Sequence, residues 1–154
     1  RPGTSPTGSI TAIYTVLVEG DDMNEPIADT TRGILDGHIV LSRALAHLNH
    51  YPAIDVLQSV SRLFVEITSK EHQKAASIFR EILGTYKKNE DIISLGMYKK
   101  GTDPRIDYAI EKINEVNNFL KQSVFEEDNL QNAINKMIEI TSDYEEKVVK
   151  KLKT

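Results

Sequence analysis

Residues 51–62 read YPAIDVLQSVSR, and the rest of the chain is organised around them. Tyr51 offers a flat aromatic face beside a proline turn, and four apolar residues in the middle are available for burial (Ile54, Val56, Leu57 and Val60). Arg62 ends this packed segment, so we expect its guanidinium to have a fixed direction rather than to be mobile. An aimed guanidinium suits a phosphate or a carboxylate because its charge is permanent and its donors are forked. A surface salt bridge is the alternative fate of such an arginine.

The charge pattern changes just after this stretch. Residues 1–66 hold four Lys and Arg against eight Asp and Glu, whereas residues 67–154 hold fifteen of each. An acidic, sparsely charged region therefore precedes one whose charges are dense and balanced, as on exposed helices with paired charges. The whole chain of 154 residues carries a net charge of −4, which argues against a dedicated nucleic-acid binder.

Composition excludes several classes of protein. The chain has no cysteine, so it has no disulfide framework and no cysteine-based zinc site. No stretch approaches 18 uninterrupted apolar residues, and the N-terminus lacks a charged start followed by an apolar core. We therefore expect a soluble protein that is not secreted.

The first region alternates strand and helix patterns. Residues 9–18, SITAIYTVLV, predict a strand that is apolar on both faces, as in a sheet covered by helices. Residues 27–35 predict a short helix, residues 38–42 a second strand and residues 43–48 a helical turn or two. This order is typical of an α/β layer with parallel strands. Two strands do not make a stable sheet of that kind, so the other strands are expected from sequence outside this chain.

Two groups of residues resemble metal sites only weakly. The acidic turn with Asp21, Asp22 and Glu25 lacks the alternating oxygen ligands of a calcium loop. His47 and His50 are three apart, but no glutamate lies between them and no third ligand is near. We predict no metal site at either place.

From residue 67 the apolar spacing becomes helical. One apolar stripe predicts a helix over about 68–88, a shorter segment follows at 91–97, and Asp103-Pro104 opens the next helix. A last helix follows the acidic residues Glu126, Glu127 and Asp128. Three to four amphipathic helices with short connections predict a small bundle. The expected core positions are Ala75, Ala76, Phe79, Ile82, Leu83, Tyr86, Ile106, Ala109, Ile110, Ile113, Val116, Leu120, Leu130, Ala133, Ile134, Met137, Ile138, Tyr144, Val148 and Leu152.

Three long motifs resemble the flagellar and type III secretion export ATPases, relatives of the catalytic subunit of the rotary ATP synthase. They are GSITAIYTVLVEGDDMNEPIADTTRGILDGHIVLSR at 8–43, YPAIDVLQSVSR at 51–62 and LGMYKKGTDPRIDYAI at 95–110. The resemblance covers most of residues 1 to about 125, and the sequence of residues 18–43 favours the flagellar branch.

The resemblance implies an α/β region followed by an all-α region. Residues 1–66 would be the last strands and helices of a RecA-like nucleotide-binding domain, and residues 67–154 a C-terminal helical domain. No G-x-x-x-x-G-K-[ST] phosphate loop occurs in the chain. In this family that loop, the magnesium-coordinating aspartate and the glutamate that activates water precede the matched region. We therefore expect ATP and Mg²⁺ as cofactors of the full-length protein, and no ATP hydrolysis by this chain alone.

Specific roles also follow from the resemblance. Arg62 matches an arginine finger that acts across a subunit interface of a homo-hexamer. Tyr51 matches the aromatic that packs against adenine. Val124 falls where the ATP synthase subunit has a second adenine-packing aromatic, and Leu130 is a candidate for a third wall.

The loop at 98–104, YKKGTDP, lies where rotary relatives contact their central stalk with an acidic segment. Lys99 and Lys100 replace that acidic character, so the resemblance implies a negatively charged, coiled-coil stalk partner. An ordinary solvated loop is the alternative. Export substrates and chaperones would be further partners of a cytoplasmic ATPase held peripherally at the membrane export gate, with no role for nucleic acid.

Two hypotheses from different classes remain. The first is the C-terminal part of a hexameric ATPase that energises flagellar or virulence protein export. The second is a noncatalytic helical module that binds a coiled-coil stalk partner. A RecA-type helicase acting on RNA is disfavoured by the acidic first half and by the lack of a basic stripe interleaved with aromatic residues.

Overall fold

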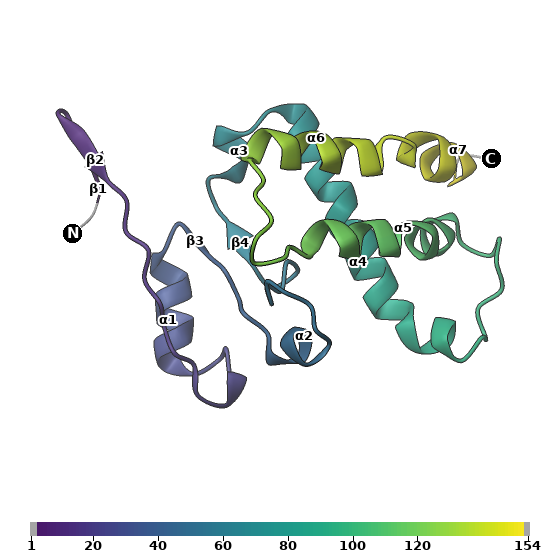
Figure 1. The fold of residues 1–154 in the computed structure, drawn as a ribbon, viewed down its shortest axis with the longest axis horizontal. Helices are drawn as coiled ribbons and strands as arrows, with labels where there is room; N and C mark the ends of the chain where they lie inside the picture. The colour runs from purple at the N-terminus through teal and green to yellow at the C-terminus, as the bar shows by residue number, and fades with distance from the viewer. Residues whose placement is uncertain (1–2, 153–154) are drawn as a thin grey trace. The chain divides into compact units, whose positions relative to one another are not determined.

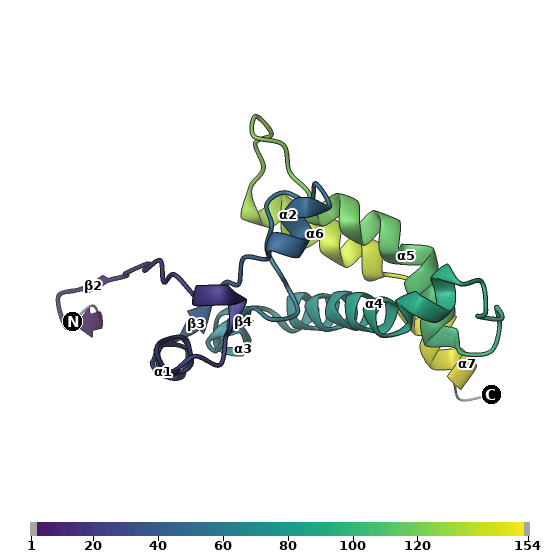
Figure 2. The same ribbon diagram turned by 90° about the horizontal axis from the view of Figure 1, so that it is seen from below.

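The computed structural model describes residues 3–152 (Figures 1 and 2). The chain divides into two compact units, one ending at Leu35 and the other beginning at Asp36. No helix of the described residues is long and apolar enough to cross a membrane.

The first unit contains a hairpin and a helix. Strands β1 (Gly3–Ser5) and β2 (Gly8–Ile10) pair antiparallel, a 3-10 turn follows at Glu19–Asp21, and α1 runs over Pro26–Ile34. The predicted helix is confirmed, with Pro26 in its first turn where a missing amide costs nothing.

The predicted strand at 9–18 is wrong in extent, because β2 ends at Ile10 and residues 11–18 form no regular element. Both described strand pairs are also antiparallel rather than parallel. A strand persists only where a neighbour takes its backbone hydrogen bonds, and no described strand lies beside residues 11–18. Ile13 and Leu17 are accordingly 94% and 89% exposed.

The second unit begins with a small antiparallel pair. Strand β3 (Gly37–His38) pairs with β4 (Val60–Ser61), and Leu41 bridges Ile54. A Cβ at Gly37 would lie 2.7 Å from the Val60 carbonyl oxygen, so only glycine allows this close approach. Between the strands, α2 (Arg43–His47) confirms the predicted turn of helix, and the Ser42 side chain caps it by accepting from the Leu45 amide.

Helices make up the rest of the second unit (Figure 1). The short α3 (Phe64–Ile67) leads into α4 (Lys70–Ser94), α5 (Pro104–Leu120) and α6 (Leu130–Thr141). A π-helical turn at Glu145–Val149 and α7 (Lys150–Leu152) complete it. Asp103 caps α5 as predicted, by accepting from the Arg105 amide at 2.8 Å.

The two helical segments predicted at 68–88 and 91–97 are one helix of 25 residues. Gly84 does not interrupt it, because an isolated glycine costs a helix only about 1 kcal/mol and neighbouring packing offsets that cost. The chain turns instead at Gly96, whose φ of +67° is readily adopted by glycine.

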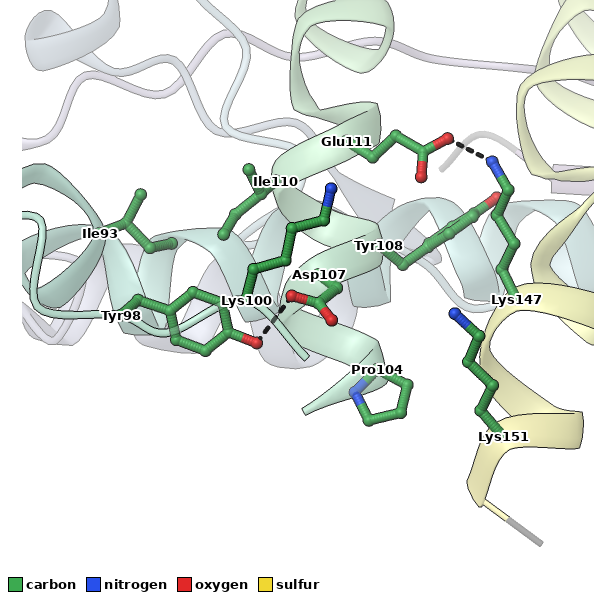
Figure 3. A pocket seen from close by; sticks show the side chains of 10 residues that line it. All are labelled: Ile93, Tyr98, Lys100, Pro104, Asp107, Tyr108, Ile110, Glu111, Lys147 and Lys151. Carbon is green, nitrogen blue, oxygen red and sulfur yellow. Dashed lines mark hydrogen bonds and ion pairs between the residues drawn. The ribbon is translucent and has the colours of Figure 1, made fainter. Parts of the chain in front are cut away.

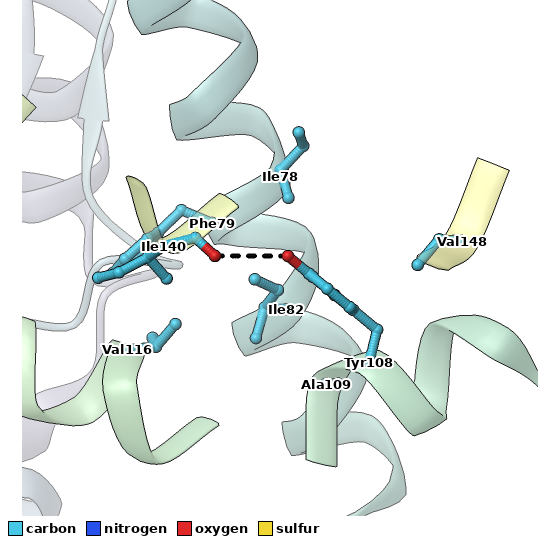
Figure 4. Packing of buried hydrophobic residues seen from close by; sticks show 8 residues of the cluster. All are labelled: Ile78, Phe79, Ile82, Tyr108, Ala109, Val116, Ile140 and Val148. Carbon is cyan, nitrogen blue, oxygen red and sulfur yellow. Dashed lines mark hydrogen bonds between the residues drawn. The ribbon is translucent and has the colours of Figure 1, made fainter. Parts of the chain in front are cut away.

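The core lies between α4, α5, α6 and the C-terminal turn (Figure 4). Its buried members are Ile78, Phe79, Ile82, Tyr108, Ala109, Val116, Ile140 and Val148. The predicted core positions Phe79, Ile82, Ala109, Val116 and Val148 are confirmed in this cluster, and Ala75 and Ile113 are also buried as predicted. Ile78, Tyr108 and Ile140 were missed, and Leu130 was wrongly placed in the core because 75% of it is exposed.

Candidate functional site

A hydrogen-bonded turn at residues 55–59 forms the middle of the segment 51–62. Asp55 is only 8% exposed, and one of its oxygens accepts from the amides of Leu57 (3.0 Å) and Gln58 (3.1 Å). The other oxygen accepts from Gln58 Nε2 at 2.9 Å. The Asp55 carbonyl accepts from both the amide and the hydroxyl of Ser59, at 3.0 and 2.6 Å. One aspartate thus closes the turn at its N-terminal end.

The Asp55 carboxyl is held in its ionised form. Burial raises its pKa, but the hydrogen bonds from Gln58 and Leu57 and the charge of Lys87 lower the pKa below the ordinary value. Lys87 Nζ lies 3.8 Å from the carboxylate. The turn is therefore organised around a negative charge at neutral pH.

Arg62 follows directly after β4. Its backbone amide donates to the Asp36 carbonyl at 2.8 Å, and the Val40 amide donates to the Ser59 hydroxyl at 3.0 Å. These bonds fix the backbone on both sides of β4, while the Arg62 side chain is exposed. Val60 just before it is 44% exposed, so the backbone at Arg62 is held by these hydrogen bonds rather than by burial of β4, and its role stays a prediction.

Tyr51 lies at the other end of the segment, after a cis Tyr51–Pro52 peptide bond. Its side chain is 54% exposed, and its carbonyl accepts from the Gln122 amide at 2.9 Å. Gln122 belongs to the loop 121–129, which projects from the ends of α5 and α6 in Figure 2. The structure therefore joins the backbone of the Tyr51 turn to the loop that carries Val124.

Val124 and Leu130 themselves face solvent. Val124 is 93% exposed, and Leu130, the first residue of α6, is 75% exposed. Their roles as walls of an adenine pocket therefore stay predictions. Phe125, which the sequence analysis did not single out, is 94% exposed beside Val124. An aromatic residue next to the expected position was the signal that could have found it.

His50 lies buried next to Tyr51, with 7% of it exposed. Its amide donates to the Leu45 carbonyl at 3.0 Å, and its Nε2 has no hydrogen-bond partner among the described residues. Burial, and then the charge of Lys121, lower the pKa of the His50 imidazole. His47 is exposed on α2, so the two histidines do not share an environment.

Lys100 lines a cavity of about 560 Å³ at the N-terminal end of α5 (Figure 3). Lys147 and Lys151 line the same cavity from the C-terminal segment. Asp107 holds the loop by accepting from the Tyr98 hydroxyl at 3.0 Å and from the Gly101 amide at 2.9 Å. No ion pair is formed by Lys99, Lys100 or Lys151 within residues 3–152. Lys151 had no sequence signal beyond its charge.

A partly buried polar network supports one wall of this cavity. The Tyr108 hydroxyl donates to Asp143 at 2.6 Å, and Asp143 also pairs with Lys147 at 2.9 Å and Lys112 at 3.6 Å. Burial and the Asp143 charge raise the pKa of the Tyr108 hydroxyl. Burial raises the Asp143 pKa, but Tyr108 and the two lysines lower it overall. Lys147 also pairs with Glu111. These groups are satisfied by one another, so we treat them as structural.

Comparison with known proteins identifies both regions. Residues 1–61 match the nucleotide-binding domain of the ATP synthase alpha/beta family, and residues 68–139 match the T3SS EscN ATPase C-terminal domain. The second region is thus similar to the C-terminal domain of type III secretion ATPases, and the first to the nucleotide-binding domain of the wider ATP synthase family. The recognition of this family from the sequence is confirmed, as is the fold class of an α/β region followed by helices. The predicted boundary between residues 66 and 67 stays a prediction.

Relatives from both branches of the family are about equally similar. The chain is 51% identical over 145 residues to the flagellum-specific ATP synthase of Bacillus subtilis, covering 94% of the chain and 33% of the relative. It is 52% identical over 142 residues to the type 3 secretion system ATPase of Sinorhizobium fredii, covering 92% and 32%. The chain thus spans about a third of the length of these relatives, and identity does not separate the two branches.

Solved structures of this family have the same fold. The assembled ATPase EscN of the enteropathogenic E. coli type III secretion system superposes with a TM-score of 0.87 at 44% identity, over 91% of the chain and 34% of EscN. EscN in complex with its central stalk EscO gives a TM-score of 0.81 at 42% identity, over 91% and 33%.

Proposed function

We propose that this chain is the C-terminal part of a homo-hexameric ATPase that hydrolyses ATP to energise flagellar or virulence type III protein export. The observation that carries the proposal is the segment 51–62, which holds an exposed aromatic at one end and an exposed arginine at the other on a hydrogen-bonded turn. The segment lies almost wholly within the match to the ATP synthase nucleotide-binding domain. The family of this match is one of ATP-dependent enzymes.

In this proposal Arg62 reaches the nucleotide bound by the neighbouring subunit. There its guanidinium stabilises the negative charge that spreads over the phosphoryl oxygens in the transition state. Tyr51 packs on the adenine bound by its own subunit, and Val124 and Leu130 supply apolar walls around the base. Mg²⁺ and the phosphates are held by residues of the full-length protein outside this chain. The chain has no phosphate loop, and we expect no turnover from it alone.

The proposed partner surface is the loop that carries Lys99 and Lys100. Both lysines are exposed and form no ion pair within the described part of the chain, so they are available to a negatively charged partner. A coiled-coil stalk is the partner class, supported by the EscN–EscO complex among the structural relatives. We further propose export substrates and chaperones as partners, and a cytoplasmic location with peripheral association at the membrane export gate.

A noncatalytic helical module that binds a coiled-coil partner is the second candidate. It is favoured by the helical bundle, whose core is formed by the second unit alone. The two proposals differ in the sequence that precedes this region in the gene. A G-x-x-x-x-G-K-[ST] motif there supports the ATPase proposal, and its absence would refute that proposal in favour of the noncatalytic module.

The substitution Arg62→Ala tests the proposed function in the full-length protein. We expect ATP turnover to fall by about 10³-fold or more, as for arginine fingers elsewhere, with nucleotide affinity within a few fold of wild type. Phosphate release and binding of a fluorescent ATP analogue measure the two quantities. Unchanged turnover would refute the assignment of Arg62.

A further inference from the structure

Arg80 of α4 joins the helical bundle to the turn at 55–59. One of its terminal nitrogens donates to the carbonyls of Val56 at 2.6 Å and Ser59 at 3.2 Å, and the other donates to the carbonyl of Leu57 at 3.0 Å. Three backbone carbonyls thus converge on one guanidinium. Asp55 accepts from the amides of this turn, and Arg80 donates to its carbonyls along its length.

The base of the Arg80 side chain is fixed by the core. Its neighbour Phe79 is 3% exposed and Ile82, two residues further, is 2% exposed, so this part of α4 is held by packing against α5 and α6. Lys87 lies seven residues along α4, which places it on the same helix face, and it pairs with Asp55 at 3.8 Å. One face of α4 therefore contacts the turn through two cations.

The geometry points to Arg80 as a positioning residue that holds Arg62 in place through the backbone of residues 56–59. Ser59, whose carbonyl Arg80 binds, is followed by the two residues of β4 and then by Arg62. This inference rests on the proposed role of Arg62 at the neighbouring nucleotide. It adds that the helical domain sets the position of the finger.

The fork of the arginine side chain matters for this role. A guanidinium offers its donors in a fixed plane and spans several acceptors at once, whereas a lysine ammonium is a point donor on a flexible stem. Without Arg80 the turn keeps the bonds made by Asp55, but the carbonyls of Val56, Leu57 and Ser59 lose their bonds to the guanidinium. We expect the turn to survive and the backbone near Arg62 to loosen.

A double-mutant cycle on the full-length hexamer tests the inference. Arg80→Ala should lower kcat by about tenfold to a hundredfold, because small displacements of catalytic groups cost that much, while KM for ATP changes by less than about threefold. In an Arg62→Ala background the same substitution should have no further effect on kcat, since Arg80 acts through Arg62. Arg80→Lys should restore part of the loss. Phosphate release in a single turnover, with enzyme in excess over ATP, measures the slow rates of the variants that lack Arg62.

Lys88→Ala is the matched control, because Lys88 is an exposed cation on α4 that makes no contact with the turn; it should keep wild-type kcat. An equal loss of kcat from Arg80→Ala with and without Arg62 would overturn the inference, as would wild-type kcat in Arg80→Ala. If the Arg80→Ala protein does not form the hexamer, a double-mutant cycle of Arg80→Lys with Arg62→Ala replaces it. The inference again fails if Arg80→Lys lowers kcat equally with and without Arg62. If Arg62→Ala alone keeps full ATP turnover, the proposed role of Arg62 is refuted, and so is this inference. If Arg62→Ala abolishes turnover but Arg80→Ala keeps wild-type kcat, only the role of Arg80 is refuted.

Discussion

At the scale of single residues, Tyr51 gives a test of nucleotide binding that is separate from catalysis. Its ring is half exposed on a turn whose carbonyl is tied to Gln122, so the ring is available without rearrangement of the backbone. Stacking on an aromatic face is worth about 0.5–1.5 kcal/mol beyond its buried area. Tyr51→Ala in the full-length protein should weaken binding of a fluorescent ATP analogue by about tenfold. Tyr51→Phe keeps the face and is the control; a defect in kcat alone would count against adenine packing.

His50 predicts a dependence of stability on pH. Its folded pKa lies below the ordinary 6.5, so the unfolded chain binds the proton more tightly than the folded chain does. The stabilisation from a neutral His50 is therefore complete above about pH 6.5 and is lost as the pH falls below that value. The melting temperature, followed by circular dichroism, should fall between pH 7.5 and pH 5.5 and should fall less in His50→Gln. The exposed His47→Gln is the control, and equal slopes in both variants would contradict the assignment.

At the scale of elements, α4 is the helix on which the second unit is built. Its buried face packs on α5 and α6, and Glu81 accepts a hydrogen bond from the Tyr144 hydroxyl at 2.6 Å. Ile82 is 2% exposed, so Ile82→Ala leaves a cavity that the surrounding helices fill only in part. We expect a loss of about 2–5 kcal/mol in the free energy of unfolding, measured with denaturant. Leu95→Ala, at a residue 71% exposed, should cost less than about 0.5 kcal/mol; a comparable loss there would contradict the assigned core.

The helices were predictable because their signals are local. Apolar spacing marks α4 and α5, and Asp103-Pro104 marks a helix start by capping chemistry alone. Residues 11–18 were mispredicted because a strand depends on partners that no local pattern contains. Ile78 and Ile140 were missed because they lie at the edges of apolar stripes. The angle at which the helices cross decides which edge is buried, and the sequence does not show that angle. Tyr51 and Arg62 stood out from their residue types, but their predicted roles came from resemblance. The contact of Arg80 with backbone carbonyls could not be predicted, because any sequence in the turn has those carbonyls.

At the scale of the whole molecule, α4 connects the proposed partner loop to the proposed nucleotide-facing segment. A helix of 25 residues is about 37 Å long, and its last residues lead into the loop that carries Lys99 and Lys100. Arg80 and Lys87 contact the turn at 55–59 from the same helix. Helix α4 thus contacts the turn at 55–59 along its length and ends where this loop begins.

Charge reversal tests whether this loop is the partner surface. Lys99→Glu with Lys100→Glu should raise the concentration of stalk protein needed for half-maximal stimulation of ATP turnover by about tenfold, and the effect should shrink as salt is added, because exposed charges are screened. Basal turnover should not change, since both lysines lie in the loop after α4 and neither has a hydrogen bond or ion pair to residues 55–62. Lys88→Glu reverses a charge on α4, away from the loop, and serves as the control. Stimulation that is unaffected by the reversal would remove the loop as the partner surface, and a fall in basal turnover would show that the lysines act on the fold instead.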